Sequence, residues 1–477
     1  MENTRNLTGR EKASYGLGAV GKDMVYMLSA SYVLYYFKDI MGVSAAAMGV
    51  ILLAARVFDA FNDPVMGLIV ARTRTRWGKF RPWMFLGTLT NAVVLFLMFA
   101  APPTLDGAGL VAYAAVTYIL WGVTYTMMDI PFWSMIPAFT KGGREREGLT
   151  TLARSCSGVG SALVTIFTMI LVHAIGSALG HGSSPREIER IGFQVFALIV
   201  AILFVVFIAI TCLAVKEKST VDMETAGVRQ MFRTLISNDQ AMCVVVTIVL
   251  VNSALYITSN LVIYFFKYDF GGSNWYQSYT GFNLVAGATQ ILAMMALYPL
   301  LRRFVSSIRI FYISLAMSML GYLLLFGIAS LGKNTLALLL IPGVLIMAAS
   351  GMNNVLTTIF LANTVDYGQL VRGRRDESVI FSMQTFVVKL ASGLAAFIAS
   401  MALQAFGLSS TATSATDQTV DFSAQVATAS KMGLRMVMTL IPMAGLILAF
   451  LWFRRKYILT DAKLDEISEQ LRAKEQL

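Results

Sequence analysis

The stretch RVFDAFNDP, Arg56 to Pro64, places two acids inside an apolar run that extends from about Ser44 to Val70. Asp59 and Asp63 are four residues apart, so on a helix they share one face. A charged carboxylate near the centre of a bilayer costs about 2.5–3.5 kcal/mol, so such residues usually face a cavity and have a function. The stretch therefore predicts a membrane helix that carries a functional pair of acids.

The oxygen atoms on this helix suit a small hard cation. The two carboxylates offer several lone pairs each, and the neighbouring Asn62 adds a neutral carbonyl oxygen. Thr126, three residues before an acid in a later span, adds a hydroxyl if the two helices touch. The alternative is an internal salt bridge, for example from Asp59 to Arg56, with no ion involved.

The composition predicts a polytopic membrane protein. The chain is 57% hydrophobic and 14% charged, whereas a soluble domain carries about 25% charged residues. The net charge of +11 suggests nucleic acid, but the basic residues lie in the loops between spans, where they set topology, so no nucleic-acid partner is expected. Neither the two histidines nor the three cysteines have metal-ligand spacing, and no catalytic motif is found, so neither a resident cofactor nor an enzyme is expected.

The apolar pattern predicts an all-α membrane protein with twelve transmembrane helices, because only helices satisfy their own backbone groups in lipid. Twelve spans separated by a central loop favour two six-helix bundles of the major facilitator type. The expected limits are 16–42, 44–71, 83–103, 109–137, 149–178, 191–215, 240–268, 276–302, 308–331, 335–364, 377–406 and 431–454.

The loop charges and the longest polar interruption predict the topology and the domains. Basic residues mark the even-numbered loops and the tail, above all RTRTRWGKFRP at 72–82, so both termini are expected in the cytoplasm, in a cell membrane. These basic loops either clamp the cytoplasmic side through salt bridges and the membrane surface or act as topology signals only. The expected domains are an N-terminal bundle at 1–215, a central cytoplasmic loop at 216–239, a C-terminal bundle at 240–454 and a cytoplasmic tail at 455–477.

Other polar residues inside the spans suggest a site for a hydroxyl-rich ligand. Asp129 and Trp133 share one helix face, and a carboxylate beside an aromatic ring commonly holds a sugar. Arg154 and Asp23 extend this logic, since hydroxyls both donate and accept hydrogen bonds; Lys22 and Asp23 are expected about two turns into the first span. The alternative for Trp133 is an interfacial aromatic residue. Lys389 either reaches the acids of the N-terminal half or extends to the cytoplasmic face.

Several long motifs resemble the glycoside–pentoside–hexuronide:cation symporters, most closely their melibiose-type carriers. The likeness runs nearly end to end and is strongest in the N-terminal half. It rests on YGLGAVGKD (Tyr15 to Asp23), RVFDAFNDPVMG (Arg56 to Gly67), TRWGKFRPW (Thr75 to Trp83), TYILWGVTYTMMDIPFWSMIP (Thr117 to Pro137), REREGL (Arg144 to Leu149) and NTVDYG (Asn363 to Gly368).

This resemblance implies a major facilitator fold and coupled transport of a sugar with Na⁺, Li⁺ or H⁺ by alternating access. By matching motifs, it assigns the coupling cation to Asp59 and Asp63, with Asn62 and Thr126 near them. It assigns a glycoside, such as a galactoside, to Lys22, Asp23, Asp129, Trp133 and Arg154, and places Lys389 close to both sites. The expected partners are therefore a sugar, a monovalent cation and the lipid bilayer, and a monomer is expected.

Two departures from the family pattern and three alternatives stay open. Where melibiose-type carriers have a tryptophan in span ten, this chain has Asn354, which puts melibiose itself in doubt. The family's ADTVDYG reads ANTVDYG here, with Asn363, which bears on cytoplasmic gating. The alternatives are a hexuronide or pentoside symporter, a proton-coupled antiporter and a non-transporting sensor.

Overall fold

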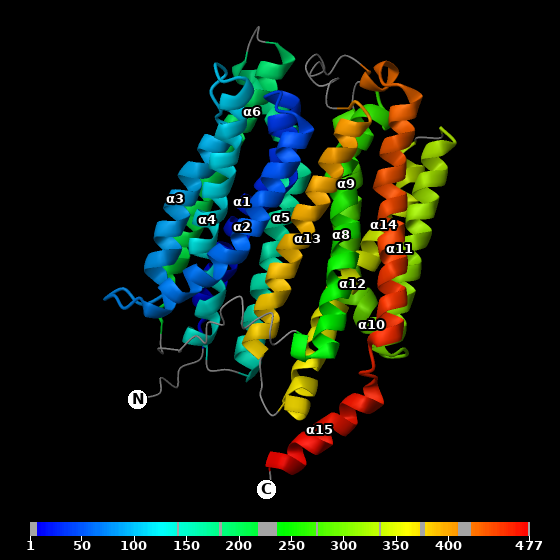
Figure 1. Ribbon diagram of the computed structural model, residues 1–477. Helices are drawn as coiled ribbons and strands as arrows, with labels where there is room; N and C mark the ends of the chain where they lie inside the picture. Colours follow the sequence, from blue (N-terminus) through cyan, green and yellow to red (C-terminus); the bar gives the residue numbers. More distant parts are fainter. Residues whose placement is uncertain are drawn as a thin grey trace. The chain divides into compact units, whose positions relative to one another are not determined.

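The computed structural model consists mainly of long helices throughout the part of the chain that it describes (Figure 1). The described residues are 7–140, 143–180, 184–217, 236–272, 275–332, 335–372, 377–408 and 421–475. They fold into two compact units. The first unit is Met1–Thr225 with Gly272–Thr280 and Gly407–Phe422, and the second is Ala226–Gly271 with Gly281–Phe406 and Ser423–Leu477.

Each unit contains six long helical segments within the described residues. The first unit holds α1 (Gly9–Tyr35), α2 (Ala45–Arg72), α3 (Arg81–Phe99), α4 (Gly107–Phe139), α5 (Gly143–Leu179) and α6 (Pro185–Ala214). The second is built mostly from α8 (Asp239–Phe265), α9 (Trp275–Leu292), α10 (Tyr298–Arg302), α11 (Ser307–Ser330), α12 (Leu336–Arg372), α13 (Glu377–Ala405), α14 (Thr428–Lys456) and α15 (Asp461–Glu475), with α9 and α10 joined by a π-helical turn into one span.

Eleven helical segments of the described chain are long and apolar enough to cross a membrane. The remaining expected span, 16–42, corresponds to α1, whose mean hydropathy is lowered by Lys22 and Asp23. Helix α1 begins at Gly9, earlier than expected, so Lys22 lies roughly three and a half turns into the helix rather than two. The segment expected only as a polar tail contains the helix α15.

Polar caps explain where several of the helices begin. Thr8 and Glu11 form a reciprocal capping box before α1, with the Thr8 backbone N–H donating to the Glu11 carboxylate over 2.8 Å. The side chains of Ser44, Ser184 and Asn238 accept a hydrogen bond from the first turn of α2, α6 and α8 in the same way. These caps satisfy backbone donors that the helices leave unpaired.

Close approach of helix backbones holds the first unit together. Helix α1 packs on α5 and α6, α3 packs on α4 and α6, and α2 packs on α4. Where α5 meets α6, a Cβ atom on Gly176 would collide with the carbonyl oxygen of Ile188, and one on Gly192 would collide with that of Val172. Glycine at these two positions therefore sets the spacing of the two helices, as small residues do in membrane bundles.

The first helix of each unit ends in a π-helical turn that buries charged residues. Tyr36–Ile40 follows α1 and reads YFKDI, and Phe266–Phe270 follows α8 and reads FKYDF. Lys38, Asp39 and Lys267 are each about 1% exposed. The two units therefore share a five-residue π-helical turn with a lysine and an aspartate, a likeness that the sequence patterns did not indicate.

We expect Gly176→Ala to destabilise the protein by about 1–3 kcal/mol, because the added methyl group meets the backbone of α6. Thermal unfolding of the purified protein in detergent measures the effect. Gly158→Ala is the matched control on the same helix, since nothing lies within 4 Å of its Cβ position. Equal unfolding temperatures for the two variants would contradict this account of the α5–α6 packing.

Candidate functional site

The acids of α2 differ in their partners. Asp59 is 4% exposed and forms an ion pair with Arg56, whose Nη1 atom lies 3.1 Å from Asp59 Oδ2. Arg56 also donates to the hydroxyl of Tyr118 on α4 over 3.1 Å. The internal salt bridge between Arg56 and Asp59, which the sequence offered as an alternative, is therefore present. Through Arg56 it is also connected to α4.

Asp63 instead accepts a hydrogen bond from α4. The hydroxyl of Thr126 donates to Asp63 Oδ1 over 2.9 Å, so helices α2 and α4 do touch at this level. One turn earlier on α4, Gly122 leaves room for Asp59, whose Oδ1 atom would lie 2.9 Å from a Cβ atom there. The α2–α4 contact thus gathers two carboxylates and a hydroxyl.

Asn62 adds an unsatisfied polar group beside these oxygens. Its Nδ2 atom is buried and has no hydrogen-bond partner among the described residues. A buried amide of this kind costs free energy unless a ligand or a water completes it. This nitrogen is a donor and does not itself bind a cation. The four residues expected to hold a cation nevertheless lie on α2 and α4, which touch here, and their carboxylate, hydroxyl and amide oxygens are of the kind that bind Na⁺ or Li⁺.

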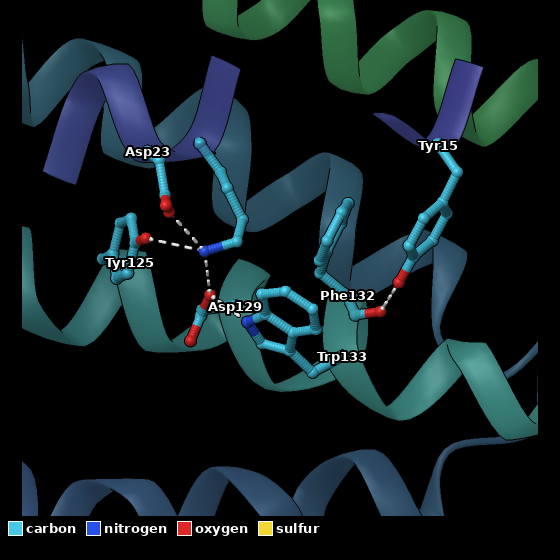
Figure 2. Close-up of polar contacts among 7 residues, drawn as sticks. Tyr15, Asp23, Tyr125, Asp129, Phe132 and Trp133 are labelled. Atoms are coloured by element: carbon cyan, nitrogen blue, oxygen red, sulfur yellow. Dashed lines mark hydrogen bonds and ion pairs between the residues drawn. The ribbon is translucent and has the colours of Figure 1, made fainter. Parts of the chain in front are cut away.

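A second charged cluster joins α1 to α4 further along (Figure 2). The Nζ atom of Lys22 lies 2.7 Å from Asp23 Oδ1 and 2.8 Å from Asp129 Oδ1, and it donates to the Tyr125 hydroxyl over 3.3 Å. The Lys22 side chain is 5% exposed, whereas those of Asp23 and Asp129 are 19% and 21% exposed. The cluster holds one lysine against two carboxylates, and the carboxylates have room for further hydrogen bonds.

Trp133 and Arg154 extend this cluster toward solvent. The indole N–H of Trp133 donates to Asp129 Oδ1 over 3.1 Å, which fixes the ring beside the carboxylate. The guanidinium carbon of Arg154, on α5, lies 4.1 Å from the centre of the Trp133 ring, and the Arg154 side chain is exposed. Acid, base and aromatic face are thus adjacent and accessible, which suits a hydroxylated ring.

Tyr15 holds the end of this cluster in place. Its hydroxyl donates to the backbone carbonyl of Phe132, and its ring stacks on that of Phe132 with 4.5 Å between ring centres (Figure 2). Because Phe132 precedes Trp133, this contact fixes the α4 backbone where the indole ring begins. The Tyr15 side chain is buried, so it supports the cluster and does not belong to its accessible face.

An aromatic stack on α4 connects the two clusters. Tyr118 stacks on Trp121 with ring centres 5.7 Å apart, and Trp121 stacks on Tyr125 with ring centres 5.3 Å apart. At one end of the stack Tyr118 contacts Arg56, and at the other end Tyr125 contacts Lys22. We call Tyr118, Trp121 and Tyr125 the aromatic ladder; their spacing along the sequence, which puts them on one helix face, is the signal that could have revealed it.

The tenth candidate residue, Lys389, belongs to the second unit. It lies half-buried on α13, whereas the other nine candidates lie in the first unit. Asn354 is on α12, where it is exposed and lines a small pocket with Asn252, Ser350 and Asn353. Amides and hydroxyls therefore occupy this part of the second unit.

The second unit also contains a buried ion pair that the sequence reading did not select. Arg435 on α14 donates two hydrogen bonds, of 2.7 and 2.6 Å, to the Asp269 carboxylate in the π-helical turn after α8. A bidentate pair of this kind is strong and specific in geometry. The two residues are far apart in sequence, so no spacing rule connects them.

Removing the charge of Lys22 tests the first-unit cluster. We expect Lys22→Gln to destabilise the purified protein by about 3–5 kcal/mol, because two acids then lack their base. Adding Asp129→Asn should restore part of the loss in thermal unfolding. Lys463→Gln, which breaks an exposed pair with Glu466, is the control and should change stability by about 0.5 kcal/mol or less. A Lys22→Gln variant as stable as this control would refute the cluster's structural role.

Comparison with known proteins shows a sequence likeness along nearly the whole chain. Residues 14–461 match the model of the family described as MFS/sugar transport protein. The lactose permease of Lactobacillus delbrueckii subsp. bulgaricus is 27% identical over 471 residues, covering 96% of this chain and 72% of that protein. The putative glycoside/cation symporter YagG of Escherichia coli K12 is 27% identical over 466 residues, covering 98% and 95%. The raffinose carrier protein of Pediococcus pentosaceus is 26% identical over 473 residues, covering 96% and 70%.

Solved structures share the fold at low sequence identity. A bacterial homolog of the human lysosomal transporter Spinster superposes with a TM-score of 0.66 at 13% identity, covering 94% of this chain and 95% of that one. The nucleoside transporter NupG superposes with a TM-score of 0.63 at 13% identity, covering 93% and 99%. The arrangement of helices is therefore that of the major facilitator transporters.

Proposed function

Since the chain belongs to the MFS/sugar transport protein family, we propose that it is a symporter that couples a glycoside to Na⁺, Li⁺ or H⁺. As a member it is a multi-pass membrane transporter with a major facilitator fold, and not an enzyme. The observation that carries the finer proposal is the pairing, within one six-helix unit, of an oxygen-rich acid cluster with a separate acid–base–aromatic cluster, joined by the aromatic ladder.

In this proposal the cation binds at the α2–α4 contact. Asp59 and Asp63 supply carboxylate oxygens, and Thr126 and the carbonyl group of Asn62 complete the set with neutral oxygens. Arg56 competes with the cation for Asp59, because both neutralise the same carboxylate. A bound cation therefore has the effect of releasing Arg56 from Asp59 toward its other partner, the Tyr118 hydroxyl.

The glycoside binds at the second cluster. Asp23 and Asp129 accept hydrogen bonds from sugar hydroxyls, Arg154 donates to them, and Trp133 covers the apolar C–H face of the ring. Lys22 pairs with both acids and holds them in place. The relatives named for lactose and raffinose carry galactosides, and a galactoside is accordingly the first substrate class to test.

A hexuronide is the second candidate. Its carboxylate would need a base that is not already neutralised, and Lys22 lies between two acids. Arg154, which is exposed and stacked on Trp133, is the remaining base of the cluster for that role. Two ionised acids beside it would repel such a substrate, which is why an uncharged glycoside fits better.

Coupling follows from a shared set of contacts. At one end of the aromatic ladder Tyr118 contacts Arg56, which pairs with Asp59, and at the other end Tyr125 contacts Lys22, which pairs with Asp129. A change in the position of Arg56 can therefore alter the position of Lys22. The coupling must be reciprocal, because a cation that tightens sugar binding is itself bound more tightly when sugar is present. Transport then proceeds by alternating access, as in other secondary transporters of this fold.

We also propose the membrane topology of the chain and a role for the second unit. We place both termini in the cytoplasm and keep the domain limits of 1–215, 216–239, 240–454 and 455–477, on the strength of the loop charges and the central polar interruption. We propose that Lys389, on α13, responds to occupancy of the cation and glycoside sites, and that the protein works as a monomer.

Replacing Asp59 tests the cation site. We expect Asp59→Cys to abolish stimulation of sugar uptake by Na⁺, Li⁺ or a proton gradient while some sugar binding survives, because the substitution removes a cation ligand but leaves the α1–α4 cluster intact. Uptake into proteoliposomes with imposed cation gradients, and direct binding of galactosides, glucosides and uronides, measure the two effects.

Asp106→Cys is the matched control, since Asp106 is an exposed acid before α4. It should retain full cation stimulation. Wild-type sugar binding that is indifferent to Na⁺, Li⁺ and pH would refute coupling, and stimulation that persists in Asp59→Cys would place the cation elsewhere.

A further inference from the structure

The connection between α2 and α3 projects from the first unit as an ordered loop (Figure 1). It spans residues 73–80 and closes on itself: the Thr75 hydroxyl donates to the Gly78 carbonyl over 2.7 Å and accepts from the Trp77 N–H over 3.2 Å. Gly78 has a φ angle of 109°, a conformation that other residues rarely adopt. At the start of the loop, Thr73 accepts from the Trp83 indole over 2.7 Å. The loop therefore has a fixed shape.

A reciprocal pair of helix caps attaches this loop to the end of α6. The Glu217 carboxylate, just beyond α6, accepts from the backbone N–H groups of Lys79, Phe80 and Arg81 over 2.7, 2.8 and 3.2 Å at the start of α3. In return, the Arg81 guanidinium donates to the Cys212 carbonyl over 2.8 and 2.5 Å in the last turn of α6. An acid thus caps the N-terminus of one helix and a base caps the C-terminus of the other, each favoured by the helix dipole.

Glu217 and Arg81 interact with the helix ends that they cap, whereas three nearby arginines take no part in these caps. Arg72, Arg74 and Arg76 are exposed and have no hydrogen bond or ion pair within the part of the chain that the structure describes. Trp77 lies between them and α3, 39% exposed, with its ring packed edge-on against Phe85 at 5.8 Å. Arg72 at the end of α2, together with Arg74, Arg76 and the exposed indole of Trp77 in the loop, therefore forms a basic surface directly beyond a membrane span.

We propose that this loop is a docking surface for the headgroups of anionic phospholipids. An indole favours the depth of the headgroups, and arginine binds phosphate through parallel N–H groups. Basic clusters immediately beyond a membrane helix attract anionic lipid at about 1 kcal/mol per residue, which is about fivefold in binding for each arginine. The caps and the turn at Thr75–Gly78 fix the backbone of the loop, so less backbone freedom is lost on binding.

Local fluorescence quenching tests this surface on the full chain in vesicles. The vesicles contain either phosphatidylcholine or phosphatidylglycerol brominated high on the acyl chain, in a background of unlabelled phosphatidylcholine. The signal of Trp77 is the difference between wild type and Trp77→Phe. We expect phosphatidylglycerol to quench it several-fold more strongly than phosphatidylcholine does, and added salt to weaken this preference.

Charge variants decide whether the arginines cause the preference. The triple variant Arg72→Gln/Arg74→Gln/Arg76→Gln should lose it, whereas Arg72→Lys/Arg74→Lys/Arg76→Lys should keep most of it because the charge remains. The control Arg454→Gln/Arg455→Gln/Lys456→Gln removes the same number of charges from exposed positions at the end of α14 and should leave the Trp77 signal unchanged. Equal quenching by the two lipids in wild type, a preference that survives the triple glutamine variant, or an equal loss in the control would overturn the proposal.

Discussion

The arrangement of the first unit depends on the neutralisation of four acids inside a membrane bundle. An uncompensated carboxylate at this depth costs several kcal/mol, so each of the four must find a partner on another helix or nearby on its own. Asp23 and Asp129 share Lys22, Asp59 uses Arg56, and Asp63 takes a hydroxyl from Thr126. These partners lie on α1, α2 and α4, and their pairing fixes which faces of the three helices meet.

The four acids fall into two groups with different chemistry, and this division supports the proposed function. Asp63 accepts a hydrogen bond from the Thr126 hydroxyl, and Asp59 lies one turn away on the same face of α2. Two carboxylates on one helix face, with a hydroxyl beside them, suit a small cation. The acids around Lys22 share the charge of one lysine, and their side chains are 19% and 21% exposed, so they suit a ligand rich in hydroxyl groups.

The aromatic ladder gives these two groups a physical connection within one helix. The Tyr118 hydroxyl accepts a hydrogen bond from Arg56, and the Tyr125 hydroxyl accepts one from Lys22. Trp121 packs between the two tyrosine rings. The Trp121 indole N–H is buried and has no hydrogen-bond partner among the described residues. Its position is therefore set by packing alone, which lets it follow a shift of either neighbour.

Much of the site could be predicted from the sequence, because charge in an apolar span is a strong signal by itself. Spacing along the helix puts Asp59 and Asp63 on one face and Asp129 beside Trp133, and the motif likeness places Thr126 near the acids of α2. The structure shows the hydrogen bonds from Thr126 to Asp63 and from Trp133 to Asp129. The helical class followed from the length of the apolar runs, and the helix ends differ from the expected limits where a polar cap or a charged first turn extends the helix.

Other contacts could not be predicted, since they join residues that no period connects. The Asp269–Arg435 pair spans two helices that are distant in sequence, and the caps formed by Glu217 and Arg81 depend on how α3 and α6 lie together. The π-helical turns are a further case, because a single extra residue in a helix leaves no change in hydropathy. The sequence left open whether Asp59 is paired with Arg56, and only the distance of 3.1 Å between the two side chains shows that this salt bridge is formed.

The central claim is that the cation and the glycoside bind to separate clusters that are energetically coupled. Calorimetric titration of the purified protein measures this most directly, with galactoside titrated at zero and saturating Na⁺, and Na⁺ titrated at zero and saturating galactoside. The account predicts that each ligand tightens the other by the same factor, on the order of 5- to 150-fold. Affinities that do not change in either direction would contradict it.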